Sequence, residues 1–293
     1  MAEGQYSIRQ VINRADEVFK ENYIDASDLN ARVLMEHLLK IDTAELISRH
    51  EEVISDDLLA QYSALVRRRL RREPLQYITR RTEFWSLEFY VDQRVLIPRP
   101  ESEHIVEAVL ADHEDRKKPY AIADIGTGSG CIGIALAVEL GRAKVFGVDV
   151  DPGALEVATI NASRHNVSNR VTFYRGNLLA PLRDLSSPKG FNIIVSNPPY
   201  ISEMEARELE PEVIKAEPYG ALISGPTGLE VYEKFIPQIS HMLRKDGRFY
   251  LEIGMGQESE VRGLISKEQG LVYERTVPDL AGIPRVVAGT RRD

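Results

Sequence analysis

Residues 121–130 read AIADIGTGSG, an apolar run that leads directly into a loop of alternating glycines. The run has the length of a buried strand, and residues 131–140 after the loop have helical character. Glycine has no Cβ, so its backbone can turn tightly and approach a ligand closely. In an open α/β sheet, ligands lie beyond the carboxyl ends of the strands, where this loop would be. The stretch therefore predicts the first strand, ligand-binding loop and first helix of an α/β domain.

The chain after Tyr120 continues this alternation. Strands are predicted at 121–125, 144–148, 170–174, 192–196, 248–253, 271–276 and 285–288. Helices are predicted between most of them, including 131–140, 152–166 and 229–243. Strands that alternate with helices indicate a largely parallel, doubly wound sheet. The last two strands have only a short connection, so we expect an antiparallel hairpin at one edge of the sheet.

The residues before this domain have a different pattern. Short amphipathic helices are predicted from apolar side chains at spacing four, as in Val11, Ala15 and Phe19. Ser27 and Ser55 precede acidic residues and are predicted N-caps. Pro74 should end the helical run, because proline lacks an amide donor and disfavours helix in the preceding residue.

The two regions are joined by an aromatic-rich segment. Residues 84–91 are predicted to form a strand with 95–97 pairing back on it, and a helix is expected to begin at 101–103, after Pro98 and Pro100. The predicted domains are a helical domain at 1–75, a β-hairpin linker at 76–100 and an α/β domain at 101–293.

The glycine loop predicts a nucleoside cofactor. Asp149 would end the second strand and accept two hydrogen bonds from a ribose diol. NAD and S-adenosylmethionine both carry this diol, and Gly128, Gly130 and Gly133 also spell the dinucleotide pattern G-x-G-x-x-G. The leading Asp124 is similar to the loop of S-adenosylmethionine-binding proteins, which cradles no pyrophosphate. It therefore favours S-adenosylmethionine over NAD. A glycine turn kept only for packing is the alternative.

Residues 196–200, SNPPY, would follow the fourth strand at the same sheet edge. An amide nitrogen is a poor nucleophile, because its lone pair is delocalised into the carbonyl. A site that alkylates it should present acceptors to its NH₂ group and few donors. Asn197 offers a side-chain carbonyl, and Pro198 and Pro199 offer backbone carbonyls without N–H groups. Tyr200 offers a flat face for a planar amide or base.

We therefore predict catalytic roles for Asn197, Pro198 and Tyr200, with no general base, since the alkylated cationic amide sheds its proton readily. The alternative is that the loop is only a rigid turn after a strand.

These motifs together resemble the amino-methyltransferases that act on conjugated nitrogens, and most closely the HemK/PrmC family. The similarity extends over nearly the whole chain and includes PLQYI at 74–78, FWSL at 84–87, LIPRPESE at 96–103, EP at 217–218, AL at 221–222, EIG at 252–254, DLAG at 279–282 and RVV at 285–287.

The resemblance implies a Rossmann-like class I methyltransferase sheet with a small N-terminal helical domain that grips the substrate. It implies methyl transfer from S-adenosylmethionine, with S-adenosylhomocysteine as product, to the glutamine of the Gly-Gly-Gln motif in class I peptide chain release factors. The cofactor residues it implies are Asp124, Gly126, Thr127, Gly128, Ser129, Gly130, Asp149, Asn177, Leu178 and Asn197. The substrate residues it implies are Arg99, Glu101, Asn197, Pro198, Pro199 and Tyr200.

Two positions depart from the family pattern. Arg80 stands where the family usually has glycine, and Asn177 stands in a loop that usually carries an acidic residue. We expect an adenine amino contact to be made by the Asn177 side-chain oxygen or to be lost.

Bulk properties limit the choice of partner and compartment. The net charge of −8 argues against nucleic acid as an obligatory partner. The single cysteine, Cys131, fits a reducing compartment, and the start MAEGQYSIRQ lacks the features of a signal peptide. Apolar runs are too short to span a membrane, and the six histidines lack metal-site spacing. We expect a cytoplasmic monomer without a metal.

One stretch of the chain is basic although the net charge of the whole chain is negative. It consists of Arg67, Arg68, Arg69, Arg71, Arg72, Arg80 and Arg81. It is interpreted either as a solvated helix face or as a contact for an acidic partner or RNA.

Three other functions compete with the main one. The first is a DNA or RNA amino-methyltransferase acting on adenine N6 or cytosine N4. The second is a dinucleotide-binding oxidoreductase, favoured only by the glycine pattern and Asp149. The third is a non-catalytic ribosome-associated module, which the intact Asn197 argues against.

Overall fold

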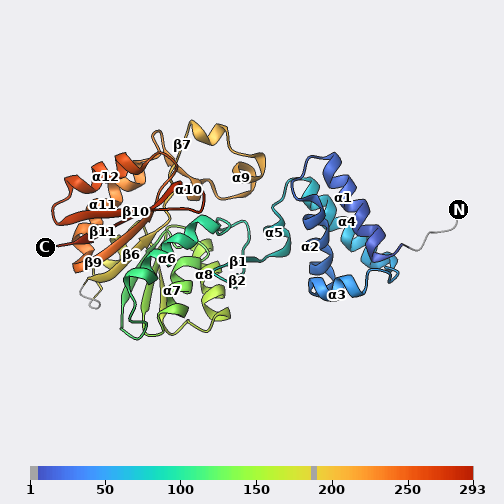
Figure 1. Ribbon diagram of the computed structural model, residues 1–293, viewed down its shortest axis with the longest axis horizontal. Helices are drawn as coiled ribbons and strands as arrows, with labels where there is room; N and C mark the ends of the chain where they lie inside the picture. Colours follow the sequence, from blue (N-terminus) through green and yellow to red (C-terminus); the bar gives the residue numbers. More distant parts are fainter. Residues whose placement is uncertain (1–5, 186–189, 293) are drawn as a thin grey trace. The chain divides into compact units, whose positions relative to one another are not determined.

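The computed structural model describes residues 6–185 and 190–292 of the chain. The chain forms two compact units, Met1–Arg80 and Arg81–Asp293 (Figure 1). No helix in the described part of the chain has both the length and the apolar character needed to cross a membrane.

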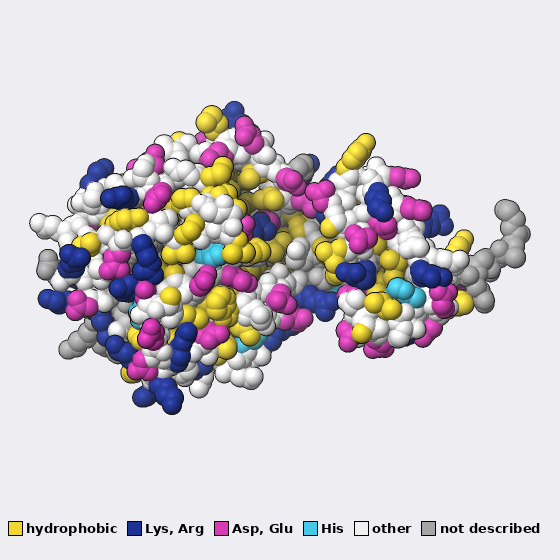
Figure 2. All heavy atoms as spheres, in the orientation of Figure 1, with side chains coloured by type: hydrophobic (Ala, Val, Ile, Leu, Met, Phe, Trp, Pro, Cys, Tyr) yellow, Lys and Arg dark blue, Asp and Glu magenta, His cyan; other side chains and the backbone are white. Residues whose placement is uncertain are grey.

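The described part of the first unit is built from helices, with one isolated β-bridge between Ser7 and Val53. Its helices are α1 (Ile8–Glu21), α2 (Ser27–Leu39), α3 (Thr43–Ser48), α4 (Asp56–Leu70) and α5 (Leu75–Thr79). The predicted α1 face is confirmed, because Val11, Ala15 and Phe19 are all buried in the core of this unit. Ser7 begins α1 with a capping box in which its side chain and that of Gln10 each bond the other's backbone N–H. Acidic and basic side chains alternate over the visible face of this unit (Figure 2).

The predicted helix boundaries hold in part. Ser55 caps α4, since its hydroxyl accepts from the backbone N–H of Leu58. Ser27 does not cap α2: it is the first residue of that helix, and its hydroxyl donates to Asp16 at 2.6 Å. Pro74 does follow the end of α4, but the chain then forms α5, because proline is tolerated at the start of a helix.

The arginine stretch is not simply a solvated face. Arg69 is buried and donates from Nε to Asn30 Oδ1 at 2.7 Å. Arg68 forms a salt bridge with Glu73, and Arg72 donates to backbone carbonyls of the loop after α1. These three arginines therefore hold the helical unit together.

The second unit begins with a short hairpin of β1 (Thr82–Phe84) and β2 (Leu87–Phe89). The predicted strand at 84–91 paired with 95–97 is wrong. Trp85 and Ser86 have φ of 53° and 55° and form the turn, a geometry that matches the twist of the flanking strands. Residues 95–97 lie outside any strand. After them come η1 (Pro100–Ser102) and α6 (Glu103–Asp112).

The main sheet has seven strands in the order β10-β11-β9-β6-β3-β4-β5. Their bounds are β3 (Ala121–Ile125), β4 (Lys144–Asp149), β5 (Val171–Arg175), β6 (Phe191–Ser196), β9 (Leu243–Glu252), β10 (Leu271–Pro278) and β11 (Pro284–Arg291). Strands β9, β6, β3, β4 and β5 are parallel, and β10 and β11 form the antiparallel hairpin that the short connection predicted.

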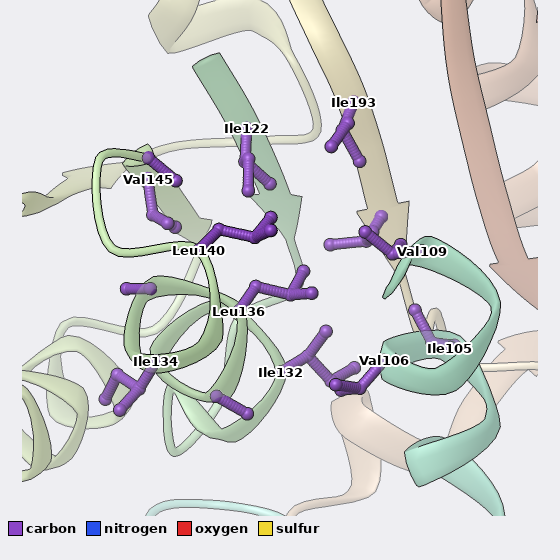
Figure 3. Packing of buried hydrophobic residues seen from close by; sticks show 14 of the residues in the cluster. Ile105, Val106, Val109, Ile122, Ile132, Ile134, Leu136, Leu140, Val145 and Ile193 are labelled. Carbon is purple, nitrogen blue, oxygen red and sulfur yellow. The ribbon is translucent and has the colours of Figure 1, made fainter. Parts of the chain in front are cut away.

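Helices cover both faces of this sheet (Figure 1). One face carries α6, α7 (Cys131–Glu139) and α8 (Pro152–Arg164), and the other carries α11 (Glu230–Met242) and α12 (Glu258–Lys267). Successive side chains of β3 enter opposite layers: Ile122 packs with α6 and α7, whereas Ala123 and Ile125 pack with α11. Figure 3 shows Ile122 and Ile193 meeting side chains of α6 and α7. Each fully buried aliphatic side chain of this kind contributes about 1.5–3 kcal/mol.

The segment between β6 and α11 holds several short elements. They are β7 (Ile201–Ser202), η3 (Glu205–Arg207), α9 (Pro211–Ala216), α10 (Tyr219–Leu222) and β8 (Ile223–Gly225), and a further turn, η2 (Ala180–Leu182), follows β5. Strands β7 and β8 pair in parallel and hold this segment beside the carboxyl end of β6.

Candidate active site

The carboxyl ends of β3, β4, β5 and β6 surround a cavity of ≈ 400 Å³. This volume lies in the range of small-molecule sites. Predicted cofactor residues that line it are Gly126, Gly128, Asp149, Asn177, Leu178 and Asn197. The topology therefore brings together residues from four separate loops, as expected for an open parallel sheet.

The glycine loop has the backbone conformation that requires glycine. Gly126, Gly128 and Gly130 have φ of 69°, 54° and 82°, in the left-handed region. The N–H groups of Gly126 and Thr127 both donate to the carbonyl of Val148, at 2.9 and 3.0 Å. The loop is thus folded back onto the end of the neighbouring strand.

The other four predicted cofactor residues do not line the cavity; they lie beneath or within the loop. Asp124 is 1% exposed and accepts from Thr127 Oγ1 at 2.6 Å and from the Gly133 N–H at 3.1 Å. Burial raises the pKa of Asp124 to about 6. Ser129 is buried, and its carbonyl accepts from Asn161. Gly130 is the N-cap of α7. These residues shape the loop from inside.

Asp149 ends β4 with its carboxylate on the cavity wall. One oxygen accepts from the Gly128 N–H at 2.9 Å and the other from the Asp151 N–H at 3.0 Å. Burial raises the pKa of Asp149 above its ordinary value. Each oxygen keeps a lone pair, so the carboxylate can also accept from a ligand diol.

A second cavity of ≈ 300 Å³ adjoins the first. It is lined by Leu96, Arg99, Asn197, Pro198, Pro199, Tyr200, Ile201, Leu209, Val213, Ala221 and Leu222. Asn197 and Pro199 line both cavities. Groups bound in the two cavities would therefore meet at the start of the Asn-Pro-Pro-Tyr loop.

The Asn197 amide is oriented from behind. Its Nδ2 donates to Ser102 Oγ at 2.9 Å, and Ser102 Oγ donates to Glu252 Oε2 at 2.6 Å. Tyr200 contributes a longer bond from its hydroxyl to Glu252 Oε1 at 3.4 Å. Among the described residues, no donor bonds to Asn197 Oδ1 or to the carbonyls of Pro198 and Pro199. The loop thus offers free acceptors where the cavities meet.

Ser102 was included only in the stretch 98–103, which the resemblance placed on the substrate side, and Glu252 was given no role from sequence. Both are almost fully buried, at 2% and 1% exposure. Burial raises the pKa of Glu252 to about 7. The available signal was a carboxylate at the end of the apolar strand β9, the same position that Asp149 has on β4.

The remaining predicted substrate residues, Arg99 and Glu101, differ in whether they line a cavity. Arg99 lines the second cavity and forms a salt bridge with Glu217 at 2.5 Å. The other carboxylate oxygen of Glu217 accepts from the Ile97 N–H. Glu101 is not among the residues lining either cavity. Among the described residues, no group of three or more His, Cys, Asp or Glu could hold a metal ion.

The helical unit has a cavity of its own, of ≈ 490 Å³, between α1 and α4. Its apolar lining residues include Val11, Ala15, Val18, Leu59 and Val66. Arg14 and Arg67 also line it, and neither forms a salt bridge with any residue the structure describes. This cavity, called the groove below, therefore has an apolar interior and two positively charged side chains in its wall.

Comparisons with known proteins cover both units. Residues 10–79 match the family model described as the PrmC N-terminal domain, and residues 105–225 match the methyltransferase small domain. The chain is 40% identical over 286 residues to the release factor glutamine methyltransferase of Geobacter sulfurreducens, covering 97% of this chain and 96% of that protein. It is 37% identical over 287 residues to the protein of the same name from Moorella thermoacetica, covering 98% and 99%.

A solved structure shares the fold at lower similarity. The hMettl16 catalytic domain, in complex with a 3′UTR hairpin, aligns with a TM-score of 0.56 and 17% identity, covering 86% of this chain and 93% of that one. This match shows the class I methyltransferase architecture alone.

Proposed function

Because the chain belongs to the release factor glutamine methyltransferase family, we propose that it methylates the side-chain amide nitrogen of the glutamine in the Gly-Gly-Gln motif of class I peptide chain release factors. The methyl donor in this proposal is S-adenosylmethionine. The observation that carries it is the position of Asn197, which lines both cavities and keeps its Oδ1 free of donors among the described residues.

The first cavity fits the donor by the chemistry of its lining. Asp149 can accept from a ribose diol, and the positive-φ glycines allow close backbone approach. Asn177 and Leu178 would lie against the base. When bound, the cofactor supplies an electrophilic methyl group on a sulfonium.

The second cavity fits a planar primary amide. Asn197 Oδ1 and the carbonyls of Pro198 and Pro199 would accept from its NH₂ group, and Tyr200 would lie against its plane. Transfer of a methyl group from the sulfonium to this nitrogen would place positive charge on that NH₂ group. Acceptors held in place stabilise this charge without reorganisation. The product nitrogen then loses a proton to solvent, so no side chain is assigned as a base.

We further propose that the helical unit contacts the release factor through the groove between α1 and α4. An apolar interior with Arg14 and Arg67 at its wall suits an acidic, partly apolar surface. This assignment gives part of the arginine stretch a role in binding, whereas Arg68, Arg69 and Arg72 are used within the unit. We propose that the protein acts in the cytoplasm as a monomer.

One experiment tests the main proposal. The protein is incubated with radiolabelled S-adenosylmethionine and a class I release factor, beside a release-factor variant in which the Gly-Gly-Gln glutamine is alanine. Label on the first substrate only is expected. Equal label on both substrates rejects the proposed target residue, and label only on added DNA or RNA favours the nucleic-acid amino-methyltransferase instead.

A further inference from the structure

Three side chains from distant parts of the chain form a continuous line of hydrogen bonds. Asn197 donates to Ser102 at 2.9 Å, and Ser102 donates to Glu252 at 2.6 Å. They come from the loop after β6, from η1 and from the end of β9. Ser102 and Glu252 are nearly inaccessible to solvent, so water cannot readily replace either partner.

The direction of this line is fixed by the number of hydrogens available. A serine hydroxyl has one hydrogen and two lone pairs. Above the pKa of Glu252, its ionised carboxylate takes the hydrogen of Ser102, so only lone pairs remain to face Asn197. An amide nitrogen can bond to those lone pairs, whereas an amide oxygen would be repelled by them.

The orientation of the Asn197 amide follows from that asymmetry. The two ends of an asparagine amide have nearly the same shape, so packing alone discriminates poorly between them. With Nδ2 held by Ser102, the oxygen is left for the cavities. In the reversed orientation the side chain would present N–H donors to the substrate NH₂ group, and two sets of donors cannot bond to each other.

We propose that Ser102 and Glu252 are positioning residues that hold the Asn197 amide with its oxygen toward the reacting nitrogen. The proposal rests on the proposed function, since it concerns the same methyl transfer. Glu252 is itself anchored: the Tyr232 hydroxyl donates to its backbone carbonyl at 2.7 Å, and the Tyr200 hydroxyl approaches its other oxygen. Tyr200 therefore contacts both the second cavity and the residue that sets the orientation of Asn197.

The test is a double-mutant cycle between Ser102 and Asn197, measured as kcat on the release factor at saturating S-adenosylmethionine. Ser102→Ala in the otherwise unchanged protein should lower kcat about tenfold, because a buried amide donor loses its partner. In the Asn197→Ala background the same change should alter kcat by less than about twofold, since no amide remains for Ser102 to orient.

The controls separate positioning from packing. Ser102→Thr keeps the hydroxyl and should recover most of the tenfold loss. Ser240→Ala removes another buried serine, whose hydroxyl donates to the Pro237 carbonyl within α11, and should leave kcat unchanged. The dissociation constant of S-adenosylhomocysteine should stay the same in the Ser102 variants.

The outcomes are distinct. An equal loss from Ser102→Ala in both backgrounds, or a loss in Ser102→Thr as large as in Ser102→Ala, overturns the positioning role. If the Asn197→Ala protein is too slow to assay, the comparison of Ser102→Thr with Ser102→Ala decides. Absence of methyl transfer by the unchanged protein would instead reject the proposed function.

Discussion

Gly128 donates its backbone N–H to a carboxylate oxygen of Asp149 at 2.9 Å. The bond joins the glycine loop after β3 to the end of β4, so the two parts of the predicted cofactor site are one structural element. Asp149 therefore has two functions in this arrangement: it fixes the loop, and it faces the cavity with lone pairs to spare.

Replacing Asp149 should weaken cofactor binding strongly. A hydrogen bond to a charged acceptor contributes about 1.5–3 kcal/mol, so losing even one bond to the ribose diol in Asp149→Ala should raise the dissociation constant of S-adenosylhomocysteine by at least about 10–100-fold. Asp149→Asn keeps one acceptor oxygen and should lose less. Isothermal titration calorimetry measures both. Asp115→Asn, in an exposed loop, is the control, and equal affinities for all four proteins would contradict the role of Asp149.

Asn197→Ala should separate chemistry from cofactor binding. Removing one preorganised acceptor at a site of developing charge lowers the rate by about 10²–10³, so turnover should fall by that factor. The affinity for S-adenosylhomocysteine should change little, because Asp149 and the glycine loop remain. Single-turnover methylation of the release factor and calorimetry give the two quantities. Turnover within about threefold of the unchanged protein would show that the amide oxygen is not used.

The sheet and its binding loop could be predicted from sequence because they depend on local pattern. Apolar runs such as 121–125 alternate with helices, and the glycines appear at the turn that needs them. The hairpin at β1 and β2 was placed wrongly for a related reason. Trp85 is of a type common in strands, and nothing local shows that Trp85 and Ser86 adopt positive φ; the burial of Phe84 and Phe89 against the α/β core determines the turn.

The line of hydrogen bonds from Asn197 through Ser102 to Glu252 could not be predicted, because it depends on long-range contacts. Ser102 and Glu252 are 150 positions apart and meet only once β9 lies beside β6. Both residues lie in stretches that carry the family resemblance, 96–103 and 252–254, but nothing in those stretches shows that the two side chains meet. The arginine stretch illustrates the same limit: Arg69 is internal because Asn30, 39 positions away, accepts from it.

Gly130→Ala should destabilise the second unit. Gly130 has φ of 82°, and an added Cβ would lie 2.8 Å from Ile134 Cδ1 and 3.3 Å from Ala158 Cβ. A strained residue of this kind costs about 1–3 kcal/mol, so the free energy of unfolding should fall by that amount. Urea denaturation followed by fluorescence of Trp85, the single tryptophan, reports on this unit specifically.

The matched control is Gly263→Ala. Gly263 lies within α12, and an added Cβ there would have no neighbour within 4 Å. Alanine favours helix over glycine by about 0.8–1 kcal/mol, so this variant should be slightly more stable than the unchanged protein. The two glycine variants are thus expected to change stability in opposite directions, and a loss in Gly263→Ala as large as that in Gly130→Ala would refute the strain argument.

Reversing charge in the helical unit should affect recognition of the protein substrate alone. The double change Arg14→Glu with Arg67→Glu is expected to raise KM for the release factor about tenfold or more, because charged pairs at interfaces steer and stabilise association. The value of kcat should stay within about twofold, since neither residue lines the cavities of the second unit. The effect should shrink at high salt, which screens charge interactions. Arg9→Glu, an exposed charge reversal on the same helix as Arg14, is the control. If the double variant leaves KM for the release factor unchanged, this groove is not the docking site.

The stability of the second unit should depend on pH through Glu252. Its pKa is raised by burial from 4.5 to about 7 in the folded protein. Between these values the folded state binds more protons at this carboxyl than the unfolded chain, so its contribution to the free energy of unfolding falls as pH rises.

Glu252→Gln keeps hydrogen-bonding groups at the position but does not titrate. The stability of this variant relative to the unchanged protein should therefore increase by about 2–3 kcal/mol between pH 5 and pH 8. Urea denaturation at four pH values, followed by Trp85 fluorescence, measures this difference. Glu114→Gln, at an exposed position of the second unit, is the matched control. A constant difference between Glu252→Gln and the unchanged protein over the whole range would mean that this carboxyl stays ionised in the folded state.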